Sequence, residues 1–214
     1  MADWIKKAKL KEGAFTTKAR AKGESVKRYA SDVIKKYGDG KWRKASNPKS
    51  ALKTYRQALL ARAFEALQRL LEEGLIESGH DRSDGGLVTA LLEMAFSGNC
   101  GIEIDLAYED PADPFALLFA EELGFVIEVE PEFQAEVERR FHQNQVPCVC
   151  IGSATQQKTA CIRVSGEVVL DEDMRDLRDF WEETSYQLER LQADPDCVEE
   201  ERLGLRERSG PPYE

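Results

Sequence analysis

A membrane-spanning helix needs an apolar run of about 18 residues. The sequence of 214 residues has no apolar run that approaches this length. Its N-terminus has no apolar core of the kind that defines a secretory signal peptide. The first residues are basic and poor in acids, as in transit peptides, but they are rich in lysine rather than arginine. These absences argue against a membrane-spanning or secreted protein, and we expect a cytoplasmic location.

Paired cysteines are also missing. The five cysteines form no CxxC motif and are odd in number; they are Cys100, Cys148, Cys150, Cys161 and Cys197. Four of them lie in or beside apolar runs that look like strands. This pattern does not indicate a disulfide framework, and we expect reduced, buried thiols in a cytosolic protein.

Acidic residues are scarce in the first third of the chain. Residues 1–64 contain 18 Lys and Arg against 5 Asp and Glu, a net charge of +13. Residues 65–214 contain 12 against 35, a net charge of −23, so the whole chain carries −10. A split of this size indicates two parts with different partners, and the acidic part is not expected to bind nucleic acid.

Hydrophobic spacing and turn residues predict the elements of the fold. Helices are expected over residues 4–10, 16–21, 26–37, 48–73, 87–96, 114–122, 131–144 and 174–192, with a charged helical piece to about 208. Ser25 is the expected N-cap of the helix over 26–37. Strands are expected over 100–106, 125–129, 148–152, 160–164 and 168–170, and Ser165-Gly166-Glu167 is typical of a tight hairpin. The order predicts an α/β fold: a layered α/β/α subdomain with a mixed sheet, preceded by a basic helical segment and followed by a long C-terminal helix.

The run from His80 to Leu87, His-Asp-Arg-Ser-Asp-Gly-Gly-Leu, places two carboxylates, a hydroxyl and two glycines before an apolar helix. Carboxylates such as Asp81 can bind a divalent cation. The Ser83 hydroxyl and the backbone N–H groups at a helix start can face phosphate oxygens. Gly85 and Gly86 allow a close approach of the backbone to a ligand. The run therefore predicts a magnesium-phosphate site, with Asp81 as the metal ligand and Ser83, Gly85 and Gly86 at the phosphates.

Each of these residues also has a purely structural interpretation. Asp84 is a second candidate cation ligand, but it is equally well placed as the N-cap of the following helix. Asp81 could order the loop, and Ser83 could be another cap. His80 is interpreted as a structural histidine, because a catalytic triad gathers side chains from distant segments.

The wider context of the run carries a family resemblance. The sequence resembles phosphoribosylformylglycinamidine synthases in three stretches, which occur in the order and spacing of that family. They are the stretch from His80 to Gly101, the stretch Phe119-Ala-Glu-Glu-Leu-Gly124 and the stretch from Trp181 to Gln192. Cys197 and residues 199–208 continue the similarity. The resemblance covers about residue 65 to the end. It implies three segments: a basic segment of separate origin (1–64), the C-terminal subdomain of the second synthetase half (65–170), and a helical connector toward a glutaminase domain (171–214).

This resemblance implies a cofactor and a reaction. In the family, this subdomain holds a structural ADP with Mg²⁺; the position of Asp81 is a magnesium ligand, and the position of Ser83 contacts the nucleotide. The family is a ligase of purine biosynthesis that uses ATP and glutamine to convert formylglycinamide ribonucleotide to formylglycinamidine ribonucleotide. The sequence has no counterpart of the other magnesium ligands, the catalytic ATP site, the catalytic histidine or the glutaminase cysteine. We therefore expect a fragment with an incomplete ADP/ATP site, inactive alone, whose partners are the nucleotide and the remaining synthase domains.

The basic segment leaves a second interpretation open. Its motifs, among them Trp4-Ile5-x-x-Ala8, Gly13-Ala14-Phe15-Thr16 and Gly23-x-Ser25-Val26, resemble small basic proteins of some phages and large DNA viruses. Lysines interleaved with aromatic residues are suited to phosphate-backbone binding with stacking, although no zinc-finger, RRM or homeodomain signature is present. One alternative is a nucleic-acid-binding or virion-associated protein that uses the synthase-like subdomain as a scaffold or interaction module. The other is a solvated basic helical arm that packs against the acidic remainder or simply neutralises it. The join near Phe64 could be natural, a gene-model error or engineered, and the apolar stripe of helix 174–192 suggests self-association.

Overall fold

A computed structural model describes residues 14–107 and 113–208. The expected helix over residues 4–10, most of the acidic loop before residue 113 and the tail after residue 208 lie outside the described residues. The chain folds into two compact units: unit 1 comprises residues 1–75 and 130–148, and unit 2 comprises residues 76–129 and 149–214. These two units are defined by packing. The boundaries expected at residues 64 and 170 were based on composition and on the family resemblance, and they stay predictions.

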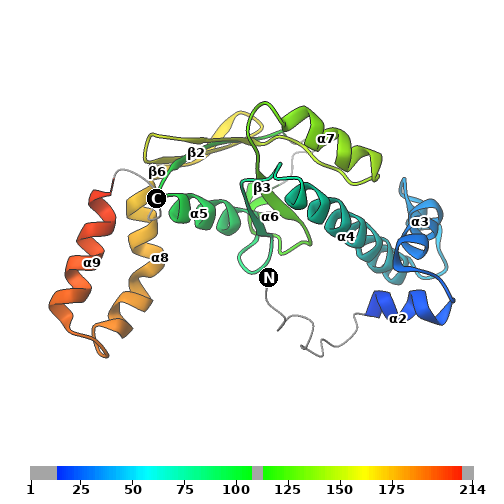
Figure 1. Ribbon diagram of the computed structural model, residues 1–214, viewed down its shortest axis with the longest axis horizontal. Helices are drawn as coiled ribbons and strands as arrows, with labels where there is room; N and C mark the ends of the chain where they lie inside the picture. The colour runs from blue at the N-terminus through cyan, green and yellow to red at the C-terminus, as the bar shows by residue number, and fades with distance from the viewer. Residues whose placement is uncertain (1–13, 108–112, 209–214) are drawn as a thin grey trace. The chain divides into compact units, whose positions relative to one another are not determined.

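Unit 1 is helical (Figure 1). Its elements are α2 (Ala14–Ala21), α3 (Val26–Tyr37), the 3₁₀ helix η1 (Lys41–Lys44), α4 (Pro48–Glu72) and α7 (Gln134–Gln143). Ser25 caps α3 as predicted, because its side chain accepts a hydrogen bond from the Arg28 N–H at 3.2 Å. Helix α4 begins at the predicted proline and passes through residue 64 without a break.

The basic segment has a core of its own. Phe15, Ala19, Tyr29, Ala30, Val33, Ile34 and Ala58 form one buried apolar cluster from α2, α3 and α4. The rings of Phe15 and Tyr29 lie 4.9 Å apart between centroids. The described part of this segment is therefore a packed helical bundle, which is inconsistent with a solvated arm.

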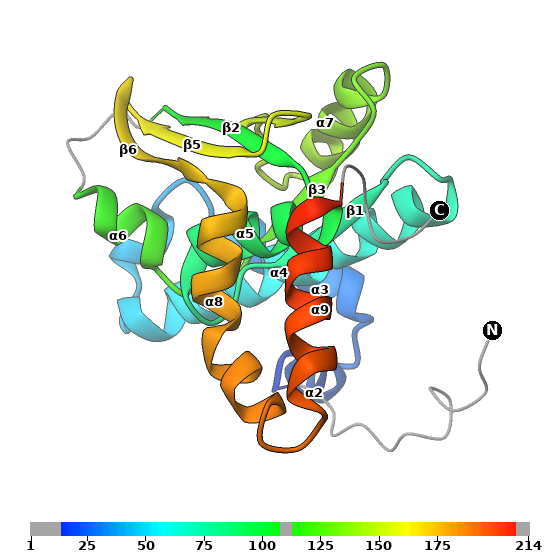
Figure 2. The ribbon, with the colours of Figure 1, turned by 90° about the vertical axis from the view of Figure 1, so that its left-hand side faces the viewer.

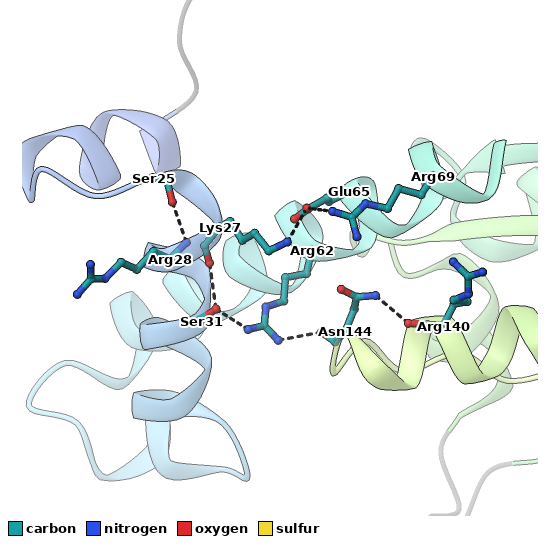
Figure 3. Close-up of polar contacts among 9 residues, drawn as sticks. All are labelled: Ser25, Lys27, Arg28, Ser31, Arg62, Glu65, Arg69, Arg140 and Asn144. Atoms are coloured by element: carbon teal, nitrogen blue, oxygen red, sulfur yellow. Dashed lines mark hydrogen bonds and ion pairs between the residues drawn. The ribbon is translucent and has the colours of Figure 1, made fainter. Parts of the chain in front are cut away.

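Polar contacts fix the helices of unit 1 against one another (Figure 3). Lys27 of α3 forms an ion pair with Glu65 of α4 at 3.0 Å. The Arg62 guanidinium donates to the Ser31 hydroxyl at 2.7 Å and to the Asn144 carbonyl at 2.9 Å. Arg62 thereby joins α3 and α4 to the end of α7, although 82 residues separate it from Asn144.

Unit 2 contains two sheets. Strands β1 (Ser78–Asp81) and β3 (Phe125–Glu128) pair antiparallel. The larger sheet has the order β4-β2-β5-β6, with β2 (Gly101–Leu106), β4 (Gly152–Thr155), β5 (Thr159–Val164) and β6 (Glu167–Asp173). Strands β2 and β5 are parallel and the outer pairs are antiparallel, which confirms the predicted mixed sheet. Ser165 and Gly166 have φ of 52° and 83°, the left-handed pair of a tight hairpin between β5 and β6.

Helices cover the apolar face of the larger sheet. The buried cluster joins α5 (Gly86–Gly98), α6 (Pro114–Phe119) and α8 (Met174–Glu189) to β2 and β5. Ile102 and Ile104 point into it and Glu103 is exposed, as the alternation predicts. Ile162 and Met174 are fully buried. The fold is thus α/β, with helical N-terminal and C-terminal parts as expected.

Helices α8 and α9 (Pro195–Glu207) lie side by side (Figure 2). Asp173 and Asp194 cap their first turns. Arg206 forms ion pairs with Asp176, at 2.7 Å, and with Asp179. Asn99, at the end of α5, donates to the Arg208 carbonyl at 3.1 Å and so connects the end of α9 to the core. No described helix is long and apolar enough to cross a membrane.

Some predicted elements are wrong or shifted. The apolar run 148–152 was expected to be a strand, but β4 begins only at its last residue, Gly152. The ladder between β2 and β4 runs from Gly101 opposite Thr155 to Ile104 opposite Gly152. The residues before Gly152 therefore lie beyond the end of this ladder. Helix α6 ends at Phe119 and α7 begins at Gln134, so both are shorter than expected.

The expectation of buried thiols is also wrong. Cys150 and Cys197 are exposed, and Cys100, Cys148 and Cys161 are half-buried, all without disulfides. Burial nevertheless raises the pKa of the Cys100 thiol, so this thiol stays protonated at neutral pH.

The cap of α8 predicts an acid-sensitive contribution to stability. Hydrogen bonds from Arg175 lower the pKa of Asp173 from 3.8 to about 2. A carboxyl with a lowered folded-state pKa stabilises the fold above its unfolded pKa, and this stabilisation is lost as the pH falls through the folded value. We expect Asp173→Ala to lower the free energy of unfolding by ~1 kcal/mol at neutral pH, and the difference from wild type should vanish between about pH 4 and pH 2.

Urea unfolding at a series of pH values measures this effect. Asp171→Ala removes an exposed carboxylate two residues away on β6 and is the matched control. A difference for Asp173→Ala that persists unchanged to pH 2, or an equal loss in the control, contradicts the account.

Candidate functional site

The predicted site residues lie in one short loop between β1 and α5. Asp81 is the last residue of β1 and pairs with Phe125 of β3. The Asp81 side chain is 68% exposed, and its Oδ1 lies 3.7 Å from Nδ1 of His80. Ser83 is also exposed. The structure thus brings the predicted residues together at the surface and leaves the Asp81 carboxylate open to solvent.

The start of α5 differs from the prediction. The N-cap is Gly85, in the left-handed conformation with φ of 78°, and no side chain caps the helix. The interpretations of Asp84 and Ser83 as side-chain caps are therefore wrong. The Gly86 N–H instead donates to the Ser83 carbonyl at 3.1 Å, a backbone turn that leaves both side chains exposed.

The two glycines are required by packing within the chain. Gly86 is buried, and a Cβ there would lie 2.6 Å from the Leu118 carbonyl and 2.7 Å from the Phe119 backbone. A Cβ at Gly85 would collide with Thr89, whose hydroxyl donates to the Gly85 carbonyl at 3.1 Å. Both glycines also have a left-handed φ that other residues rarely adopt. Their presence is therefore explained without a ligand.

Arg82 holds the loop in place, a role that the motif alone does not reveal. Its Nε donates to the Ala120 carbonyl and its Nη2 to the Leu117 carbonyl, both at 3.0 Å. These carbonyls lie in and just after the last turn of α6, where helix carbonyls lack partners within the helix. The Arg82 N–H donates to the Gly124 carbonyl at 2.9 Å, which extends the pairing of β1 with β3. The loop is thus rigidly anchored on both sides.

Two further carboxylates approach the loop. Glu121 Oε1 lies 3.5 Å from the Gly85 N–H. Glu93 of α5 lies 3.0 Å from His80 Nε2, and His80 Nδ1 lies 2.6 Å from the Asp81 carbonyl. These contacts tie His80 to the Asp81 backbone and to α5; its interpretation as a structural histidine stays a prediction. Glu121 is part of the stretch 119–124 noted in the sequence, but nothing in its spacing places it at the start of α5.

The loop fits part of a magnesium-phosphate site. Among the described residues, no group of three or more His, Cys, Asp and Glu side chains could hold a metal ion. Mg²⁺ is often bound by one or two carboxylates together with phosphate oxygens and water, so Asp81 fits one position of such a shell. The residues for the other protein ligands are not gathered here.

The family of the chain is shown by comparison with known proteins. The family model for AIR synthase related protein, C-terminal domain, matches residues 39–164, more than half of the chain. The match begins earlier than the expected boundary near residue 65, and it includes the whole of the continuous helix α4.

Curated relatives are much longer than this chain. It is 51% identical over 157 residues to the phosphoribosylformylglycinamidine synthase of Homo sapiens. The aligned region covers 72% of this chain and 12% of that protein. It is 43% identical over 152 residues to a probable phosphoribosylformylglycinamidine synthase, chloroplastic/mitochondrial, of Arabidopsis thaliana, with 71% and 11% covered. The chain thus spans about an eighth of the curated relatives that it matches.

A solved structure agrees with the fold. The T. maritima PurL complexed with FGAR has a TM-score of 0.51 at 20% identity and covers 58% of this chain and 21% of that chain. At this identity the likeness concerns the fold alone. The family match, the two curated relatives and the α/β fold agree, and this chain belongs to the family of the AIR synthase related protein, C-terminal domain.

Proposed function

We propose that this chain contributes one half of a nucleotide site to a phosphoribosylformylglycinamidine synthase, the glutamine- and ATP-dependent ligase of purine biosynthesis. The proposal rests on the 51% identity to the human synthase and on the exposed Asp81 carboxylate at an anchored loop before a helix start. In this role Asp81 binds Mg²⁺, and Ser83 with the backbone N–H of Gly85 faces the phosphates of ADP or ATP. Gly86 is buried and its N–H donates to the Ser83 carbonyl, so it shapes the turn beneath them. The bound metal would neutralise phosphate charge, and the other ligands would come from other parts of a synthase.

The chain's own residues would orient the nucleotide. Arg82 anchors the loop to the end of α6, so the backbone that carries Asp81 is held in place. Glu121 lies at the Gly85 N–H, where a phosphate would approach the start of α5. Its negative charge opposes an incoming phosphate, and we therefore expect weak nucleotide binding by this chain alone.

A binding measurement tests the site. We expect calorimetry to detect Mg²⁺-dependent ADP binding, and Asp81→Asn to weaken it by about tenfold, which corresponds to ~1.4 kcal/mol. Asp84→Asn removes the same charge from the same loop and is the matched control. No Mg²⁺-dependent binding by the wild type, or a loss caused by Asp84→Asn and not by Asp81→Asn, contradicts the assignment.

Turnover tests the proposal that the chain does not act alone. Neither the first-half catalytic histidine nor a glutaminase nucleophile is identified in this sequence, so the purified chain should show no formation of formylglycinamidine ribonucleotide from formylglycinamide ribonucleotide, ATP and glutamine. An assay for this product with the purified chain checks the expectation. Sustained turnover would contradict it.

The surface of α8 supports a role as part of a larger assembly. Phe180 of α8 is 85% exposed, and Trp181 and Leu188 on the same helix are also exposed. Leu191, two residues after the end of α8, is 83% exposed. Arg178 is buried, and its Nε and Nη2 have no hydrogen-bond partner among the described residues. Exposed apolar side chains are unfavourable in water, and buried polar nitrogens without hydrogen bonds are also unfavourable. We propose that remaining synthase domains cover this face.

Self-association of the isolated chain follows from the same stripe. In the absence of other domains, we expect the apolar faces of two copies to meet, with a mass that rises with concentration in sedimentation equilibrium. The double variant Phe180→Asp and Leu191→Asp should remain monomeric at the same concentrations. The control is Val168→Asp and Val149→Asp, at exposed apolar positions outside α8. A wild-type chain that stays monomeric, or an equal effect of the control, contradicts this role of α8.

A further inference from the structure

The described segment between Asp39 and Glu65 contains no acidic residue. We define the basic strip as the exposed cations of this segment, which are Lys41, Arg43, Lys44, Lys49, Lys53 and Arg56. They belong to η1 and to the first half of α4, two elements that pack together in unit 1. Asp39 forms an ion pair with Lys41 at 3.6 Å. Glu65 forms ion pairs with Lys27 and Arg69, which lie outside the strip.

The strip has a regular geometry on α4. Lys49, Lys53 and Arg56 follow an i, i+4, i+7 spacing, which places them on one helix face. Ala51 and Ala58 are buried on the opposite side. At a rise of about 1.5 Å per residue the strip extends for about 10 Å along the helix axis, and η1 adds Arg43 and Lys44 at its beginning. The guanidinium carbon of Arg43 lies 4.8 Å from the Trp42 ring centroid, which holds this cation beside a half-buried aromatic ring.

The strip rests on a rigid support. The buried cluster of α2, α3 and α4 includes Ala58 from the same stretch of α4. Asn47 caps α4 through the Ser50 N–H at 3.1 Å, so the helix that presents Lys49 and Lys53 starts at a defined residue. A preformed array of cations loses less conformational entropy on binding than a disordered tail does.

We propose that the basic strip binds the phosphate backbone of nucleic acid. Among the described residues before Phe64, no large hydrophobic side chain is exposed. An interfacial membrane helix needs an apolar face beside its cations, and a stable protein interface needs an apolar centre. Charge of a single sign without apolar surface is what binding to a phosphate backbone requires. The strip contributes no means of reading base sequence, so the binding is independent of sequence.

Salt dependence provides a quantitative test with the full chain and a fluorescent duplex DNA of about 20 base pairs. The logarithm of the affinity should fall against the logarithm of salt concentration with a slope of about −0.9 for each phosphate contacted. Four contacts, made by Arg43, Lys44, Lys49 and Lys53, give a slope of about −4. The triple variant Lys44→Gln, Lys49→Gln and Lys53→Gln should make the slope less steep by about 3, and replacing the same three lysines by arginine should restore it.

A matched control separates the strip from net charge. Arg28→Gln, Lys35→Gln and Lys36→Gln remove the same charge from exposed positions on α3, and their slope should stay within about 1 of wild type. All these positions are exposed, and circular dichroism checks that each variant folds. Failure of wild-type binding to the duplex, an equal change of slope in both triple variants, or binding to phosphatidylserine vesicles without binding to DNA would each overturn the proposal. None of these outcomes depends on Asp81, so the nucleotide site stands or fails separately.

Discussion

The parallel pairing of β2 with β5 is the interaction on which unit 2 depends. It joins Ile102 and Ile104 to Ala160 and Ile162 across almost sixty residues of chain, and these residues form the floor of the main apolar cluster. Helix α5 packs on this floor immediately after the Asp81–Gly86 loop. The β2–β5 core thus supports the helix that follows the loop, while Arg82 and the β1–β3 pairing anchor the loop itself.

A second constraint acts within the loop itself. Left-handed glycines at 85 and 86 allow α5 to start directly against the backbone of α6, and Arg82 binds the free carbonyls at the end of α6. The residues of the motif that suggested ligand binding in the sequence therefore have two different roles. Glycine and arginine build the turn, whereas Asp81 and Ser83 are left exposed and available. This division narrows the proposed nucleotide contact to two side chains and the backbone.

Local signals predicted much of the fold. The Ser25 cap, the start of α4 at Pro48 and the Ser165-Gly166 hairpin all depend on residues close in sequence, and each is found where the sequence places it. Strand β1 was missed because Ser-Gly-His-Asp has little strand propensity and gains its partner β3 only from residues more than forty positions later. The contacts of Arg82 and Glu121 were missed because their partners also lie more than thirty positions away in the sequence. The apolar stripe of α8 is present as predicted, but a sequence does not reveal which part of such a stripe is buried within the chain. In the structure Leu177 packs against the core, whereas Phe180, Trp181 and Leu188 are exposed.

The central claim is that the β1–α5 loop forms half of a nucleotide site, and it is tested most directly by following backbone amide resonances of the full chain during titration with ADP and Mg²⁺. The account predicts that the amides of Ser83, Gly85 and Gly86 shift with a common saturation curve and that the shifts disappear when Mg²⁺ is chelated. Shifts confined to other parts of the chain, or none at saturating ADP and Mg²⁺, would contradict it.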